Sequence, residues 1–236
     1  MTHAALRSPP VVPETRFGRW FLGTQVWTRY VVEAAFAQFL QQLPAEARRP
    51  RRILDAGCGA GVSVPLLAQH FSPETILAMD IDPGEVERSR RRLARSTHTV
   101  QFVVGDAARL SLAAGSFDMV LCHQLLHHTR TQREALSEFH RVLAPGGWLL
   151  LAESCREFIR TPAVRVMFRH PNDAQRSAAE FQQLVRDAGF AFGAAQVETS
   201  TPFWSLPDWG LARRLGWRAA APLEPTQVTL VAAKPR

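Results

Sequence analysis

Short apolar segments alternate with amphipathic ones through the middle of the chain. The amphipathic segment 131–143 places apolar residues three or four positions apart, the spacing of one helix face. The apolar segments have strand length and are 52–55, 75–79, 100–104, 117–122 and 148–152. Repeated strand–helix units predict a parallel sheet that is covered by helices on both faces.

Both ends of the chain add to this pattern. The apolar residues of 36–43 fall on one helix face, which predicts a helix before the first strand. Two further strands are predicted at 192–197 and 228–233, with no helix between them, which indicates an antiparallel hairpin at the sheet edge. The predicted fold is therefore α/β, a doubly wound seven-stranded sheet that is parallel except for its last strand.

A glycine-rich turn follows the first predicted strand. In the segment 53–61, Asp55 ends an apolar run, and Gly57, Gly59 and Gly61 follow at alternate positions before a helical stretch. Glycine tolerates positive φ and lets a ligand approach the backbone closely. The following helix offers unpaired N–H groups, so a polar ligand is expected at this turn.

Composition constrains the function only weakly. Hydrophobic residues make up 46% of the chain, and no apolar run is long enough to predict a spanning helix or a signal peptide. The net charge of +7 could attract phosphate, but Lys234 is the only lysine, and such arginine usage is typical of a GC-rich genome. Cys58, Cys122 and Cys155 are too scattered for a zinc pattern and fit a reducing, cytoplasmic setting.

Polar residues stand where the predicted strands end, which is where ligands bind in open parallel sheets. These residues are Asp55, Asp80, Asp106, His123 and Glu153. The glycine spacing is G-x-G-x-G, which differs from the dinucleotide pattern G-x-G-x-x-G. A carboxylate beside the turn disfavours a pyrophosphate and favours a cation, and Asp80 is spaced to bind a ribose diol. An adenosine that carries an amino acid and a sulfonium meets these demands.

The motif order resembles class I S-adenosylmethionine-dependent methyltransferases. Residues 55–61, Asp-Ala-Gly-Cys-Gly-Ala-Gly, are similar to the family's first motif, and 79–82 and 105–107 are similar to its second and third. Residues 116–120 and 142–147 resemble the signatures that follow. Taken together, these matches are most similar to the small-molecule branch that includes ubiquinone and menaquinone biosynthesis methyltransferases. The resemblance implies a Rossmann-like fold with an N-terminal helical segment and an inserted cap.

The resemblance also implies roles for the matched residues. The turn would receive the methionine part of the donor, Asp80 and Ile81 would bind the ribose and adenine, and Asp106 with Ala107 would bind the adenine amine and ring. His123 would flank the donor near its methyl group. The implied donor-binding set is Asp55, Gly57, Cys58, Gly59, Asp80, Ile81, Asp106, Ala107 and His123.

Methyl transfer depends mainly on alignment and desolvation, and a base is needed only for a protonated acceptor. His128, and after it His127, is the candidate base, because both follow the fourth strand. A purely structural role for these histidines is the alternative. We expect no metal: His123 and His127 lack a third ligand, and no acid stands at 122 or 123 for magnesium.

The acceptor is expected outside the donor-binding core, 51–153. Five of the six tryptophans lie outside it, which favours a bulky or apolar acceptor under a cap. The candidate cap segments are 16–50, 154–176 and 199–226, within a single domain 1–236. Ordinary helix packing, or binding of 16–43 to a membrane surface, are the alternatives for these aromatic residues.

The sequence thus predicts a methyltransferase acting on O, C or N of a small, hydrophobic or aromatic metabolite. A non-catalytic copy of the fold is a second hypothesis, and the retained acidic and glycine residues count against it. An RNA methyltransferase is a third, supported by charge alone. The acceptor, the methylated atom and the oligomeric state are left open.

Overall fold

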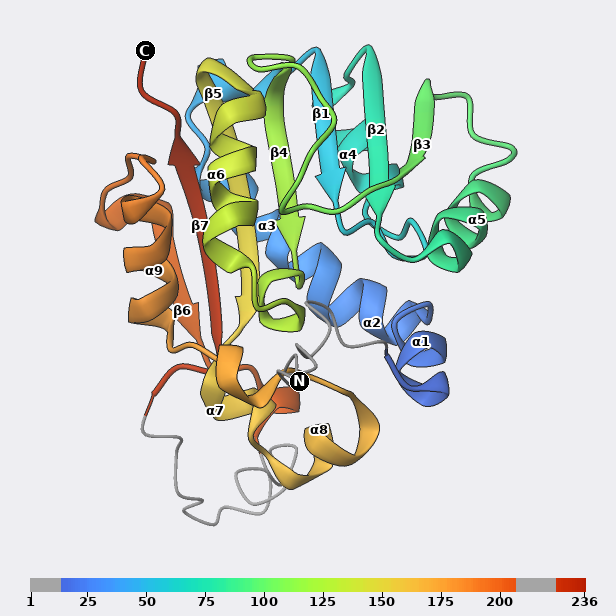
Figure 1. Cartoon of the computed structure of the whole chain (residues 1–236), viewed down its shortest axis with the longest axis vertical. Helices are drawn as coiled ribbons and strands as arrows, with labels where there is room; N and C mark the ends of the chain where they lie inside the picture. The colour runs from blue at the N-terminus through green and yellow to red at the C-terminus, as the bar shows by residue number, and fades with distance from the viewer. Residues whose placement is uncertain (1–13, 207–223) are drawn as a thin grey trace, which may run out of the picture.

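A computed structural model describes residues 14–206 and 224–236 and shows one seven-stranded sheet in the order β3-β2-β1-β4-β5-β7-β6 (Figure 1). The five predicted parallel strands are confirmed. The strands are β1 Arg52–Ala56, β2 Thr75–Asp80, β3 Val100–Val104, β4 Phe117–His123, β5 Leu143–Ser154, β6 Val197–Ser200 and β7 Gln227–Ala233. The order reverses beside β1, so the glycine turn lies at the switch point where ligands bind in such sheets.

Helices cover both faces of the sheet, as the alternating pattern predicts (Figure 1). One hydrophobic layer packs α6 and α9 on the strands, and the other packs α3 and α4. The longer helices are α3 Glu33–Gln42, α4 Val64–Phe71, α5 Pro83–Arg92, α6 Gln132–Val142 and α9 Ala178–Asp187. The short ones are α1 Arg16–Phe21, α2 Gln25–Trp27, α7 Arg156–Ile159 and α8 Pro162–Met167. No helix in the described ranges is long and apolar enough to cross a membrane.

The antiparallel end of the sheet is confirmed, but one strand lies elsewhere than predicted. β7 is antiparallel to both β5 and β6. We expected the preceding strand at 192–197, and it begins only at Val197. Before it, the backbone makes a single bridge at Ala191 and a 3₁₀ turn over Ala194–Gln196. Phe192 packs against the core instead of extending a strand, so its apolar character reflects burial and not pairing.

The N-terminal segment, expected as a cap, divides into two parts. In α3, Phe36 and Phe39 are buried in the layer that contains β1 and β7 residues, so this helix belongs to the core. Before α3, the short helices α1 and α2 and a π-helical turn, Thr28–Val32, lie beyond the carboxyl ends of the parallel strands (Figure 1). Only this first part is positioned to cover a ligand at those ends.

The glycine turn between β1 and α4 requires its glycines for two different reasons. Gly59 has a φ of +50°, and a Cβ placed there would meet no atom within 4 Å. Gly61 has a φ of +73°, and a Cβ there would overlap the Ser89 hydroxyl of α5. Gly61 therefore allows α5 to pack on the turn, whereas space beside Gly59 is open.

We predict that Gly61→Ala destabilises the fold more than Gly59→Ala. Both variants incur the strain of a left-handed residue, roughly 1–2 kcal/mol, and only Gly61→Ala adds the collision with Ser89. Urea unfolding of the two variants checks this, and Ser89→Ala should recover part of the loss in Gly61→Ala. Equal unfolding free energies for the two alanine variants would contradict it.

Candidate functional site

A cleft lies at the carboxyl ends of β1, β2, β3 and β4. Six of the predicted site residues line it, and they come from four different strand ends or turns. These six are Gly57, Asp80, Ile81, Asp106, Ala107 and His128. The other lining residues are Met79, Gly105, Ala108, Leu125, Thr129, Thr131 and Ala135. Thus the cleft is largely apolar, with two carboxylates on one wall.

Asp80 is held in the cleft by backbone amides. Its Oδ2 accepts from the Gly59 amide at 2.9 Å, and its Oδ1 accepts from the Asp82 amide at 2.9 Å. Burial raises the pKa of Asp80, and the two amides oppose that rise by stabilising the anion. The carboxylate is therefore fixed in position and retains lone pairs for a ligand.

Asp106 lies on the same wall, one strand further along. Its Oδ1 accepts from the Ala108 amide at 2.9 Å, which fixes the side chain at the start of the loop after β3. Ile81 is 40% exposed and lines the same cleft. An exposed apolar side chain next to an acceptor suits a planar ring that carries an amino group.

Asp55 does not line the cleft, contrary to the expectation that its carboxylate would face the turn. It is 1% exposed, and its Oδ2 accepts from the Ser63 hydroxyl at 2.5 Å. Burial raises its pKa to about 7, and the nearby Asp80 charge adds to that rise, while the Ser63 hydrogen bond opposes it. Its role is to join the strand to the first turn of α4.

Cys58 also lies away from the cleft. Its side chain is buried in the layer of α3 and α4, and burial raises the pKa of the thiol. The Gly57 and Cys58 amides donate to the Met79 carbonyl, at 2.8 and 2.9 Å. These amides hold the turn against β2, so they are not free to bind a ligand in this structure.

Leu125 lies against the glycine turn from the other side of the cleft. A Cβ on Gly57 would come within 2.9 Å of its Cδ1, so Gly57 is required by close packing as well as by its φ of +77°. Leu125 follows Gln124, whose φ of +55° turns the chain back over the sheet. The residues after β4 thus form the apolar side of the cleft.

A buried carboxylate at the end of β5 holds this returning segment. Glu153 is fully buried, and its Oε1 accepts from the Leu125 and Leu126 amides at 3.0 and 2.7 Å. Its Oε2 lies 2.6 Å from His127 Nδ1. Burial raises the pKa of Glu153 to about 7, and the backbone amides oppose this by stabilising the anion. A single side chain therefore fixes the backbone and one imidazole of the turn.

The two candidate bases differ in position. His127 is buried and bonded to Glu153, whereas His128 is half-buried and lines the cleft. Burial lowers the pKa of each to about 3. Both imidazoles are therefore neutral near pH 7, and only His128 reaches the cleft.

His123 lies beside the cap and not in the cleft lining. Its Nε2 is buried and lacks a hydrogen-bond partner among the described residues, and burial lowers its pKa to about 4. The indole of Trp27 meets its ring edge-on, with the centroids 6.3 Å apart. A neutral, unpartnered nitrogen is thus available at the boundary between strand end and cap.

Aromatic side chains of separate segments meet above the strand ends. Phe168, after α8, packs edge-on against Phe17 and Phe21 of α1, with centroids 6.5 and 6.0 Å apart. From the last segment, Phe203 meets Tyr30 at 5.8 Å. Residues 207–223 of the segment expected at 199–226 lie outside the described residues.

Several residues of the site could not be recognised from the sequence. Leu125 carries no chemical signal, and the role of Glu153 depends on a chain reversal that spacing does not reveal. His170 lies with its ring 4.7 Å from that of His128, although they are far apart in sequence. Of these three residues, only Glu153 could be singled out from the sequence, because it is an acid at the end of an apolar strand.

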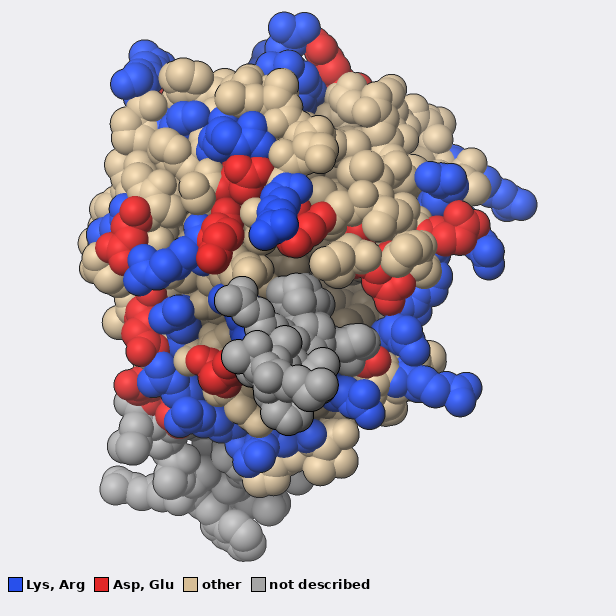
Figure 2. All heavy atoms as spheres, in the orientation of Figure 1, with Lys and Arg blue, Asp and Glu red and all other residues tan. Residues whose placement is uncertain are grey.

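Charged side chains of both signs share the face of the molecule that Figure 2 shows. On the face shown in Figure 2, lysine and arginine side chains lie among acidic ones over most of the molecule. Several arginines form exposed ion pairs, for example Arg51 with Glu74 and Arg133 with Asp187. This distribution gives little support to a nucleic-acid interface.

Known proteins share both the motifs and the fold. Residues 54–151 match the family described as "Methyltransferase domain". A malonyl-[acyl-carrier protein] O-methyltransferase of Herminiimonas arsenicoxydans is 34% identical over 179 residues, 73% of this chain and 62% of that protein. A demethylmenaquinone methyltransferase of Deinococcus radiodurans is 33% identical over 109 residues, 46% of this chain and 45% of that protein.

A solved structure of Haemonchus contortus phosphoethanolamine N-methyltransferase 2 in complex with S-adenosyl-L-methionine has the same fold. It superposes with a TM-score of 0.69 at 16% identity, over 93% of this chain and 56% of that one. Residues 54–151 therefore form a methyltransferase domain, and the chain shares its Rossmann-like sheet with S-adenosylmethionine-dependent methyltransferases. It spans about half the length of the first curated relatives, 48% and 52% in two of them.

The buried Asp55 predicts a pH dependence of stability. Its pKa of about 7 lies above the ordinary value, so the folded chain binds a proton that the unfolded chain has released. Its contribution to the unfolding free energy should therefore fall as pH rises from about 4 to 7, and stay low above that interval.

Asp55→Asn removes this titration while Ser63 keeps an oxygen to donate to. The unfolding free energy of the wild type relative to the variant should decline by a few kcal/mol between about pH 4 and 7. Urea titrations across that interval measure the difference. A constant difference would show that Asp55 titrates normally in the folded chain.

Proposed function

We propose that this protein transfers a methyl group from S-adenosylmethionine to a small, hydrophobic or aromatic metabolite. The observation that carries the proposal is the cleft in which Asp80, Ile81 and Asp106 share one wall at the switch point of a methyltransferase sheet. Relatives named for small-molecule methyl transfer support it. As the chain spans only part of their length, the activity itself is our inference.

In this proposal, Asp80 accepts from the ribose hydroxyls, with its carboxylate already held by the Gly59 and Asp82 amides. Ile81 and Ala107 pack against the adenine, and Asp106 accepts from its amine. The methionine part lies near Gly57 and Gly59, with Asp55 and Cys58 supporting the turn from inside. His123, with its unpartnered Nε2, flanks the methyl end.

The acceptor is proposed to bind beneath the aromatic side chains of α1, α2 and the segment after α8. Trp27 and Phe21 meet there at 6.0 Å, and Trp27 also contacts His123. Such a lining favours an apolar or aromatic molecule over a nucleic acid. A cytoplasmic location is part of this proposal.

Catalysis is proposed to depend on alignment of acceptor and methyl group in a desolvated cleft. For a hydroxyl acceptor, His128 is the candidate to take the proton, because it lines the cleft whereas His127 is bonded to Glu153. The lowered pKa makes His128 neutral but weakly basic, which favours an acceptor that is already acidic, such as a phenol.

We predict that Asp80→Ala weakens S-adenosylhomocysteine binding, because the ribose hydroxyls lose a charged acceptor. Each such hydrogen bond contributes roughly 1.5–3 kcal/mol, so the Kd should rise by about 10- to 100-fold for each bond lost. Isothermal titration calorimetry measures the change. The matched control is Asp82→Ala, which removes the adjacent acid that caps α5 through the Gly84 amide.

The control should leave the Kd within about twofold while lowering thermal stability by roughly 1 kcal/mol, the cost of a lost cap. Equal affinity in wild type and Asp80→Ala would refute the ribose role. If the wild type binds neither S-adenosylmethionine nor its demethylated product, the chain is a non-catalytic copy of the fold.

We predict that His128→Ala lowers kcat/KM by about 100-fold or more for a hydroxyl acceptor, as expected for loss of a general base. The same variant should leave transfer to an amine or carbon acceptor nearly unchanged, if the imidazole acts only on the hydroxyl proton. Radiolabelled methyl transfer to a panel of phenols and amines measures both. An unchanged rate with every substrate would show that His128 is not a base and only lines the cleft.

A further inference from the structure

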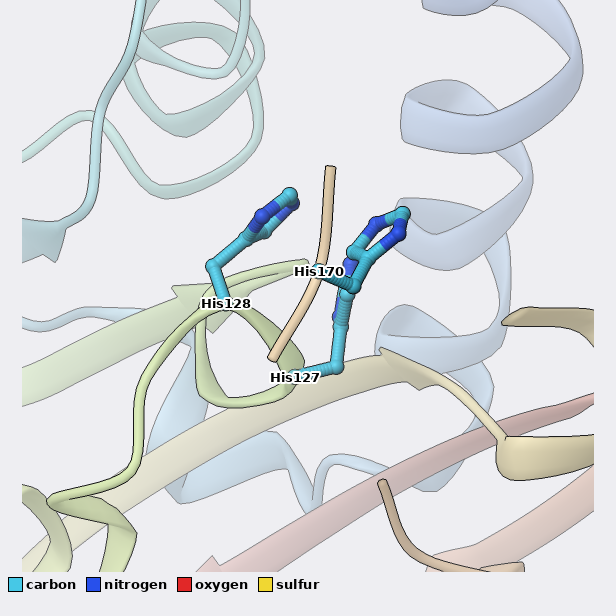
Figure 3. A group of neighbouring side chains, drawn as sticks. All are labelled: His127, His128 and His170. Carbon is cyan, nitrogen blue, oxygen red and sulfur yellow. The ribbon is translucent and has the colours of Figure 1, made fainter. Parts of the chain in front are cut away.

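Three imidazoles meet at the edge of the cleft, although their residues come from two distant segments. His127 and His128 follow β4, and His170 follows α8 (Figure 3). One ring nitrogen of each lies within 4.8 Å of those of the other two. The ring centroids are 4.2, 4.7 and 5.1 Å apart.

The structure orients one of these rings through a carboxylate. Glu153 Oε2 lies 2.6 Å from His127 Nδ1, so Nε2 is the ring nitrogen that this contact does not use. A carboxylate behind a histidine in this way is the usual support of a metal-binding imidazole, because it fixes the tautomer and raises the basicity of the ligand. Hydrogen bonding to the backbone alone would not provide that anionic support.

Two buried glutamines bring the third histidine to the pair. Gln175 donates through Nε2 to the carbonyls of His127 and Pro171, at 2.9 and 2.8 Å. Gln132 donates to the carbonyls of Leu126 and Ala174, both at 2.8 Å. These amides tie the segment after His170 to the turn that carries the other two histidines. The cluster is therefore built by directed hydrogen bonds and does not arise from loose surface loops.

We propose that His127, His128 and His170 bind a first-row divalent metal ion, with Zn²⁺ as the preferred ion. Imidazole nitrogen suits zinc and its neighbours, whereas magnesium and calcium require oxygen ligands. From the sequence we expected no metal, so this site is a proposal that only the fold suggests. A third ligand for His127 could not be recognised from the sequence, because only the fold brings His170 near.

The distances allow such an ion after a small adjustment. Zinc–nitrogen bonds of about 2.0–2.1 Å place tetrahedral ligand nitrogens about 3.4 Å apart. The candidate ligand nitrogens lie at most 4.8 Å apart. Side-chain rotations that bring them closer by about 1.4 Å would reach the tetrahedral spacing. Three protein ligands leave one position for water or an acceptor atom, as in zinc sites that act on substrates. His128 also lines the donor cleft, so the ion would lie at its wall. With the ion bound, the His128 lone pair would be used for ligation, and a metal-bound water would take a hydroxyl proton in place of the free imidazole.

The test uses the full chain, stripped of metal by a chelator and titrated with Co²⁺ as a spectroscopic probe. We expect one equivalent to bind with visible d–d absorption, and Zn²⁺ to displace it. Glu153→Gln should weaken Co²⁺ binding by about 10- to 100-fold, the usual effect of losing a supporting carboxylate. His170→Ala should weaken it by more, because it removes a ligand. The matched control is His98→Ala, an exposed histidine far from the cluster in sequence, which should change nothing.

His170 does not line the donor cleft, so His170→Ala should retain S-adenosylhomocysteine binding and the near-ultraviolet circular dichroism of the wild type. That readout separates lost ligation from misfolding and from failure of the proposed methyl transfer. His128→Ala provides a second ligand variant with the same expected loss. The proposal is overturned if the wild type binds no Co²⁺, or if His170→Ala and His128→Ala bind it as tightly as His98→Ala.

Discussion

The buried carboxylate of Glu153 is the contact on which the site depends. It stands at the end of a central strand and accepts hydrogen bonds from two amides of the segment that follows β4. Without it, those amides would be buried without partners, at a cost of about 1–3 kcal/mol each. Because the same side chain holds His127, the apolar wall at Leu125 and the three-histidine cluster share one support. The cleft and the cluster therefore form one unit.

Several of the buried titratable groups at the site are shifted towards their uncharged forms. Burial shifts Asp55 and Glu153 towards their neutral forms, and the nearby histidines are uncharged. A sulfonium donor would bring the positive charge itself. Transfer of its methyl group leaves a neutral thioether, so a neutral acceptor takes on the positive charge and an anionic acceptor is neutralised. A cleft with little water leaves the nucleophile poorly solvated and reactive. This arrangement fits catalysis by positioning better than catalysis by strong acids or bases.

The strand ends could be read from sequence because their chemistry is local. A carboxylate after an apolar run and glycines at alternate positions place Asp80 and the turn without knowledge of packing. Asp55 and Cys58 matched the same motif, yet burial turns their side chains inward. His170 could not be predicted at all, since amide hydrogen bonds between distant segments decide its position. Burial and long-range contacts, not motifs, determined what was missed.

β7 has a consequence for the order in which the chain can fold. β6 pairs only with β7 among the described strands, and α3, near the other end of the sequence, packs in the layer that contains Val231. Both hydrophobic layers therefore stay incomplete until residues 227–233 have been synthesised. Such distant contacts slow folding, because a long loop must close before they form. On the ribosome, the edge of β5 that pairs with β7 would stay open to wrong pairing until then.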